Sequence, residues 1–113
     1  MSIVSKNKIE AAGRHLLRRL ASEKRIRYSV FYGTDEASDS LLRGMSIGGD
    51  ERESAPVFMD LAIEQLEQQK LVTTRILDEL LIDGQPDYEV SLSERGNTLI
   101  ADGGEVHFES VCL

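Results

Sequence analysis

The chain has 113 residues, of which 41% are hydrophobic and 29% charged, and its formal net charge is −7. This length and apolar fraction suit a single folded domain with one hydrophobic core. No stretch approaches about eighteen consecutive apolar residues, so we expect no membrane-spanning helix. The first residues lack the apolar stretch of a signal peptide, which favours a cytoplasmic protein. Cys112 is the only cysteine, which excludes an internal disulfide and any cysteine-based zinc site.

Charge is distributed unevenly along the sequence. Residues 1–27 carry eight basic and two acidic side chains, whereas the rest of the chain carries five basic and eighteen acidic ones. Such an asymmetry usually concerns partners rather than fold. Two interpretations stay open at this point. The basic segment could lie against the acidic remainder of its own domain or of a second subunit, or it could be a surface for a nucleic-acid backbone.

Apolar residues at helical spacing predict a basic N-terminal helix over residues 6–22, with Ser5 as its N-cap. The apolar stripe of this helix consists of Ile9, Ala12, Gly13, Leu16 and Leu20. A short strand is expected over residues 25–32. Two further helices are expected over residues 36–45 and 56–70, and a proline opens the second of them, where its missing N–H does no harm.

The second half of the sequence predicts a hairpin, a short helix and a tail. Residues 71–92 contain two strand-like runs around a polar turn, and residues 77–82 could extend the first strand or form a short helix. A short helix is expected over residues 93–102, capped by the serine at its start. In the tail, residues 104–113, alternation predicts a last strand over residues 105–109.

Two passages resemble a known family of folds. Residues 66–72 (LEQQKLV) are similar to the passage from the recognition helix into the wing in MarR-like and PadR-like regulators, and residues 88–100 (YEVSLSERGNTLI) to the passage that leaves the wing. The resemblance covers about residues 35–101. It implies an α+β fold, a winged helix-turn-helix with three helices, a β-hairpin wing, a short C-terminal helix and a tail strand, in one domain over residues 1–113. Lys70 stands where the family usually has a helix-ending glycine, so a residue less suited to positive φ must make that turn.

The resemblance implies a DNA-binding transcriptional regulator that acts as a dimer, with its third helix in the major groove. The solvent stripe of that helix, however, carries three carboxylates that would meet phosphates as like charges. The residues of this stripe are Asp60, Glu64, Glu67 and Gln68. If duplex DNA is bound, we expect the contacts to come instead from Arg14, Arg18, Arg19, Lys24, Arg25, Arg27 and Arg75.

The alternative function is an acidic winged-helix interaction module or adaptor, of a kind at home in a phage or plasmid. It would dock a protein partner through the acidic stripe and would not bind DNA through its third helix. The simplest interpretation of the stripe is a solvated helix face. A homodimer through residues 6–22, residues 104–112 or both is expected, because a domain of this size has little use inside one subunit for Leu17, Val106 and Phe108 together.

Enzymatic activity is not expected. His15 and His107 have no second histidine at metal-ligand spacing, and His107 with Cys112 lies on a tail that gives a nucleophile pair no scaffold. The only adjacent glycines before the tail, Gly48 and Gly49, follow no predicted strand and make a weak phosphate loop. The sequence therefore predicts no catalytic residue, no metal and no cofactor. His15 is expected at the surface or in an interface, and Cys112 as a tail thiol.

Overall fold

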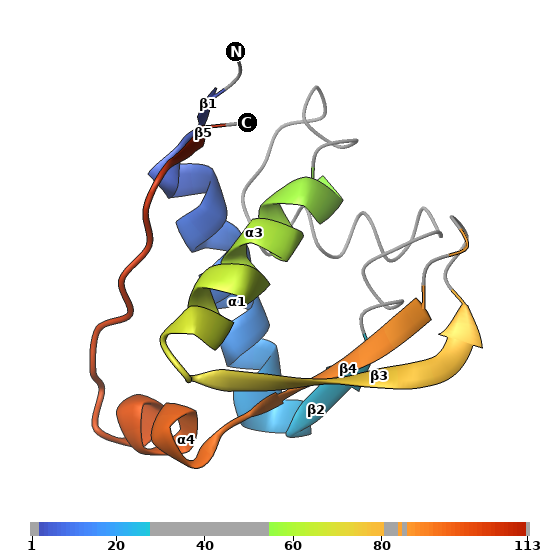
Figure 1. Cartoon of the computed structure of the whole chain (residues 1–113). Coiled ribbons are helices and arrows are strands. Elements are labelled where there is room, and N and C mark those ends of the chain that lie inside the picture. The colour runs from blue at the N-terminus through green and yellow to red at the C-terminus, as the bar shows by residue number, and fades with distance from the viewer. Residues whose placement is uncertain (1–2, 28–54, 81–83, 85, 113) are drawn as a thin grey trace.

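The computed structural model describes residues 3–27, 55–80, 84 and 86–112 (Figure 1). Its elements in chain order are β1 (Ile3–Val4), α1 (Lys6–Glu23), β2 (Arg25–Arg27), α3 (Ala55–Gln68), β3 (Val72–Leu80), β4 (Pro86–Leu92), α4 (Glu94–Ala101) and β5 (Val111–Cys112). These helices and two small antiparallel sheets form an α+β structure, as the sequence predicted. The helix predicted over residues 36–45 lies outside the described residues. Within the described ranges, no helix combines the length and the apolarity that crossing a membrane requires.

β4 is the central strand of a three-stranded antiparallel sheet in the order β2-β4-β3. Ile26 of β2 and Thr74 of β3 both lie opposite Val90. Ile26 and Val90 are buried, so this face of the sheet closes the core, and their neighbours along the strands point to the other face. β3 continues to Leu80, so residues 77–80 extend the strand instead of forming a helix.

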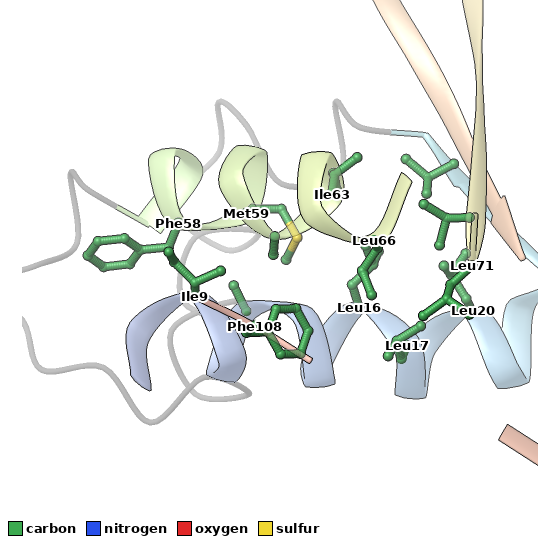
Figure 2. Packing of buried hydrophobic residues seen from close by; sticks show 14 of the residues in the cluster. Ile9, Leu16, Leu17, Leu20, Phe58, Met59, Ile63, Leu66, Leu71 and Phe108 are labelled. Atoms are coloured by element: carbon green, nitrogen blue, oxygen red, sulfur yellow. The ribbon is translucent and has the colours of Figure 1, made fainter. Parts of the chain in front are cut away.

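The core lies mainly between α1 and α3, whose apolar faces pack against each other (Figure 2). The apolar stripe predicted for the first helix is its buried face, and a fully buried leucine or isoleucine contributes about 1.5–3 kcal/mol relative to an exposed one. The fully buried aliphatic residues of α1 are Ile9, Ala12, Leu16 and Leu20. α3 contributes Phe58, Met59, Ala62, Ile63 and Leu66.

α3 ends in a Schellman motif that has lysine in place of glycine. Lys70 has a φ of +62°, which confirms that a residue unsuited to positive φ makes this turn. The N–H of Leu71 donates to the carbonyl of Leu66 at 3.0 Å, and the N–H of Lys70 donates to the carbonyl of Glu67 at 2.9 Å. Leu66 and Leu71 are both buried, so the two hydrogen bonds are accompanied by the hydrophobic contact typical of the motif.

The start of α4 is tied to the end of α3 through Ser93. Its Oγ accepts the N–H of Gly96 at 3.0 Å, which is the predicted N-cap, and donates to the carbonyl of Lys70 at 2.6 Å. The N–H of Ser93 also donates to the carbonyl of Leu71 at 3.0 Å. A Cβ atom on Gly96 would collide with this same carbonyl oxygen, so the close approach requires glycine.

The tail does not form the strand predicted over residues 105–109. Side chains of α3 bind the backbone of this segment instead. Gln65 and Gln69 are one helical turn apart, so both side chains lie on the side of α3 that faces the tail. Nε2 of Gln65 donates to the carbonyl of Glu109, and Oε1 of Gln65 accepts the N–H of Glu109, each at 2.9 Å. Nε2 of Gln69 donates to the carbonyl of His107 at 2.7 Å. The tail strand is β5 instead, which pairs antiparallel with β1.

The apolar residues of the tail and of α1 are used within one subunit. Phe108 is 1% exposed and Leu17 is 8% exposed, because both pack into the core; Val106 is half-buried. Phe108 and Leu17 therefore need no second subunit to be buried, and the prediction was wrong for these two side chains. The homodimer stays a prediction, and light scattering coupled to gel filtration would test it.

Candidate functional site

Three of the predicted DNA-contacting arginines lie on the outer face of the three-stranded sheet, beside carboxylates of the central strand. Arg25 and Arg75 come from the two outer strands and flank Glu89. The distances from Arg25 Nη1 and Arg75 Nη2 to Glu89 Oε1 are 3.8 Å and 3.7 Å. The antiparallel register brings the three charges together. Glu89 is directly opposite Arg75, and Ser91, which is opposite Arg25, is two positions from Glu89 on the same strand.

Arg27 is bound by two carboxylates. Its Nη2 lies 3.2 Å from Oδ2 of Asp87, whose side chain is 2% exposed, and it also donates to Oε2 of Glu79. Asp87 Oδ1 accepts the N–H of Tyr88 at 2.8 Å. The hydrogen bond from Arg27 to Glu79, together with the charges of both carboxylates, raises the pKa of Arg27 above its ordinary value despite some loss of solvation. This arginine is therefore part of the sheet's own charge network.

Two more of the predicted arginines form ion pairs along α1. Arg14 Nη2 lies 3.2 Å from Glu10 Oε1, and Arg19 Nε lies 2.9 Å from Glu23 Oε2, each pair spanning one helical turn. The side chain of Arg14 is 65% exposed and that of Arg19 is 27% exposed. Exposed pairs of this kind contribute about 0.3–0.5 kcal/mol and can exchange partners readily.

At least five of the seven predicted DNA-contacting residues thus have a carboxylate of the same chain within 4 Å; they are Arg14, Arg19, Arg25, Arg27 and Arg75. Arg18 and Lys24 are exposed, and Arg18 also interacts with its own chain. For Arg25 and Arg27 this arrangement agrees with the interpretation in which the basic segment lies against the acidic remainder of its own domain, whereas Arg14 and Arg19 pair with carboxylates inside the segment. A phosphate would have to compete with a carboxylate at most of these positions.

The acidic stripe of α3 is on the surface, and the structure brings its four residues together. Asp60, Glu64, Glu67 and Gln68 are all exposed along the helix. Glu67 Oε2 accepts a hydrogen bond from Thr74 Oγ1 on β3 at 2.6 Å, so the stripe borders the sheet. The hydroxyl of Tyr88 on β4 lies 3.5 Å from Asp60 Oδ1. We call this surface, made by Asp60, Glu64, Glu67 and Gln68, the acidic α3 face.

A groove of about 440 Å³ lies between α1, α4 and the first residues of the tail. Arg14 and Arg18 lie at its rim. It is assembled from two stretches that are far apart in the sequence, residues 14–21 of α1 and residues 99–106 of α4 and the tail, so no local pattern could have predicted it. The sequence pattern also does not identify Gln65 and Gln69 as the residues that bind the tail. Their amide groups bind backbone atoms, which every residue has, so no particular partner residue is required.

The histidines and the cysteine occupy separate places. His15 is buried within the chain, which corrects the expectation of a residue at the surface or in an interface. Burial, followed by the charges of Arg19 and Arg18, lowers the pKa of His15 below its ordinary value. Helix geometry explains the error, because His15 follows the buried Ala12 by three positions and so lies beside the buried face of α1. His107 is exposed and lies 3.1 Å from Glu109 Oε1. Cys112 is an exposed tail thiol, as expected.

Among the described residues, no group of three or more histidines, cysteines or acidic residues could hold a metal ion. No protein-family model, curated protein or solved structure matches the chain.

Proposed function

We propose that the chain is a winged helix-turn-helix module. α3 leads through its Schellman turn directly into the antiparallel hairpin β3–β4, which would be the wing. The second strand of this hairpin also pairs with β2, the strand that follows α1, and α4 begins at once after the hairpin. This order supports the resemblance of residues 66–72 and 88–100 to the passages that enter and leave the wing of MarR-like and PadR-like regulators.

We further propose that the module binds a protein partner through the acidic α3 face, as an adaptor. The observation that carries this proposal is the exposure of Asp60, Glu64 and Glu67 on the helix that would enter the major groove of DNA. A DNA reader needs cations or amides there, because most of its contacts are to phosphates. A basic protein surface, including one that itself binds nucleic acid, is complementary to these carboxylates.

A DNA-binding regulator is the second candidate, favoured by the arrangement of α3 and the hairpin and by the exposed arginines of α1. For this function the affinity would come from the exposed Arg14 and Arg18 and from other cations of the set, and Arg14 would have to leave Glu10 as the others leave their own carboxylate partners. Each such exchange breaks an ion pair with a carboxylate in order to form one with a phosphate. We therefore expect weak binding that is strongly dependent on salt.

Titration of a labelled duplex of mixed sequence separates the two candidates. The adaptor predicts no change in fluorescence anisotropy at about 150 mM salt. The regulator predicts binding whose salt dependence flattens by about two phosphate contacts when Arg18→Gln and Arg19→Gln are combined. Tight binding at physiological salt that is lost in this double variant would contradict the adaptor.

The protein partner is tested with nuclease-treated extract from the source cells, so that nucleic acid cannot bridge. A partner of the acidic α3 face should be retained by the wild-type protein and lost by Asp60→Lys/Glu64→Lys. The matched control is Asp102→Lys/Glu105→Lys, which makes the same change of charge at exposed positions outside α3. Equal loss in both double variants would show that net charge, and not this face, retains the partner.

A further inference from the structure

The groove between α1, α4 and the tail has an apolar floor and a charged rim. In Figure 1 the tail runs from α4 back along α1, and residues of both segments line the groove. Its floor is formed by Leu17, Ala21, Leu99, Ile100 and Val106. Arg14 and Arg18 lie on the α1 side, and Glu105 lies on the tail side. The volume of about 440 Å³ is in the range of sites for small molecules.

The two arginines are placed to hold one anion together. Arg14 and Arg18 are one helical turn apart on α1, so their side chains leave the helix on the same side. Both are exposed. The ion pair of Arg14 with Glu10 is an exposed pair within one helix, which a ligand carboxylate can replace at little cost. A planar guanidinium group matches the two oxygens of a carboxylate, so the pair suits a carboxylate head.

The apolar residues of the groove indicate that the rest of the ligand is apolar. Leu99, Ile100 and Val106 are half-buried, so each leaves apolar surface that a hydrocarbon chain could cover. Glu105 would repel a second negative charge at the tail side of the groove. The geometry therefore selects a molecule with one anionic head and an apolar body, and it disfavours a nucleotide or a polyanion.

We propose that this groove binds a small amphiphilic carboxylate, with the head between Arg14 and Arg18 and the apolar body along Leu99, Ile100 and Val106. The site shares no residue with the acidic α3 face, so the proposal stands independently of the proposed function. It goes beyond that function because it gives the module a ligand of its own.

Decanoate, kept below its micelle-forming concentration, is a suitable probe. We expect saturable one-to-one binding by calorimetry, with methyl chemical-shift changes at Leu99, Ile100 and Val106. Decanol has the same chain without the charge and should bind about tenfold more weakly, because it forms no charge-assisted hydrogen bonds. Equal binding of the two compounds, or shift changes centred on the buried Phe108, would overturn the proposal.

Three variants decide which groups are responsible. Arg14→Gln/Arg18→Gln should weaken decanoate binding by about tenfold or more, whereas Arg25→Gln/Arg75→Gln removes the same charge from the sheet and should leave it unchanged. Ala21→Phe keeps both arginines but fills the floor, and it should also abolish binding. Undiminished binding in either groove variant would overturn the proposal, as would binding to anionic lipid vesicles without any binding of monomeric decanoate.

Discussion

The ring of Phe108 lies directly on the backbone of Gly13. A Cβ atom at Gly13 would come within 2.5 Å of Cε1 of this ring and closer still to its Cζ. The missing side chain of one residue in α1 therefore makes the space in which the tail residue is buried to 1% exposure. Glycine in a helix interior normally costs stability relative to alanine, and here the cost is offset by the packing of an aromatic ring.

This contact predicts an unusual sign for Gly13→Ala. The substitution should lower the free energy of unfolding by about 1–3 kcal/mol, although glycine-to-alanine changes in helices usually raise it. Urea denaturation measures the effect. Combining Gly13→Ala with Phe108→Leu should recover part of the loss, because the smaller side chain relieves the collision. Strictly additive effects of the two substitutions would contradict the contact.

Lys70→Gly should stabilise the protein. Lys70 holds a φ of +62° at the end of α3, a conformation in which a side chain costs roughly 1 kcal/mol. Glycine removes that strain, so the midpoint of urea denaturation should rise. Glu64→Gly, at an exposed position within the same helix, is the matched control and should destabilise by about 1 kcal/mol. A similar loss in both variants would be evidence against strain at Lys70.

His15 makes stability depend on pH. Burial lowers the pKa of His15 in the folded protein, so the unfolded chain takes up a proton at a pH where the folded one does not. The contribution of neutral His15 to the free energy of unfolding is complete above about pH 6.5 and is lost as the pH falls toward the lowered pKa. His15→Gln should flatten the dependence of the thermal midpoint on pH over this interval. An unaltered slope in His15→Gln would assign the dependence to other groups.

Arg27 and Arg25 lie on the same strand but should differ in importance. Arg27→Met removes the guanidinium group that lies 3.2 Å from the buried carboxylate of Asp87. Arg25→Met leaves Glu89 with Arg75 at 3.7 Å. Asp87 is more deeply buried than Glu89, which also keeps a second arginine, so Arg27→Met should lower the denaturation midpoint by the larger amount. Equal effects would mean that Asp87 is stabilised little by Arg27.

The sequence predicted those parts of the fold that depend on neighbouring residues. The stripe of Ile9, Leu16 and Leu20, the cap at Ser93 and the turn at Lys70 each depend on local spacing or local backbone geometry. The hairpin could be predicted for the same reason, because alternating residues on both sides of a turn specify it.

Features that need distant segments were not predictable. Residues 105–109 alternate like a strand, yet their backbone is bound by Gln65 and Gln69, which are about forty residues away in the sequence. The groove beside Arg14 and Arg18 arises in the same way, because residues 103–106 of the tail line it together with α1. The ion pairs of the predicted DNA-contacting arginines depend on strand register, which composition does not give.

The pairing of β1 with β5 has a mechanical consequence. Ile3 lies opposite Cys112 and Val4 opposite Val111, so a force that pulls the two ends apart acts on one residue pair at a time, as on a zipper. Such loading opens strands at low force, because the hydrogen bonds break in succession and never share the tension. The next segment to peel away would be the tail with Phe108, which would uncover α1 while the hairpin and α3 stay folded.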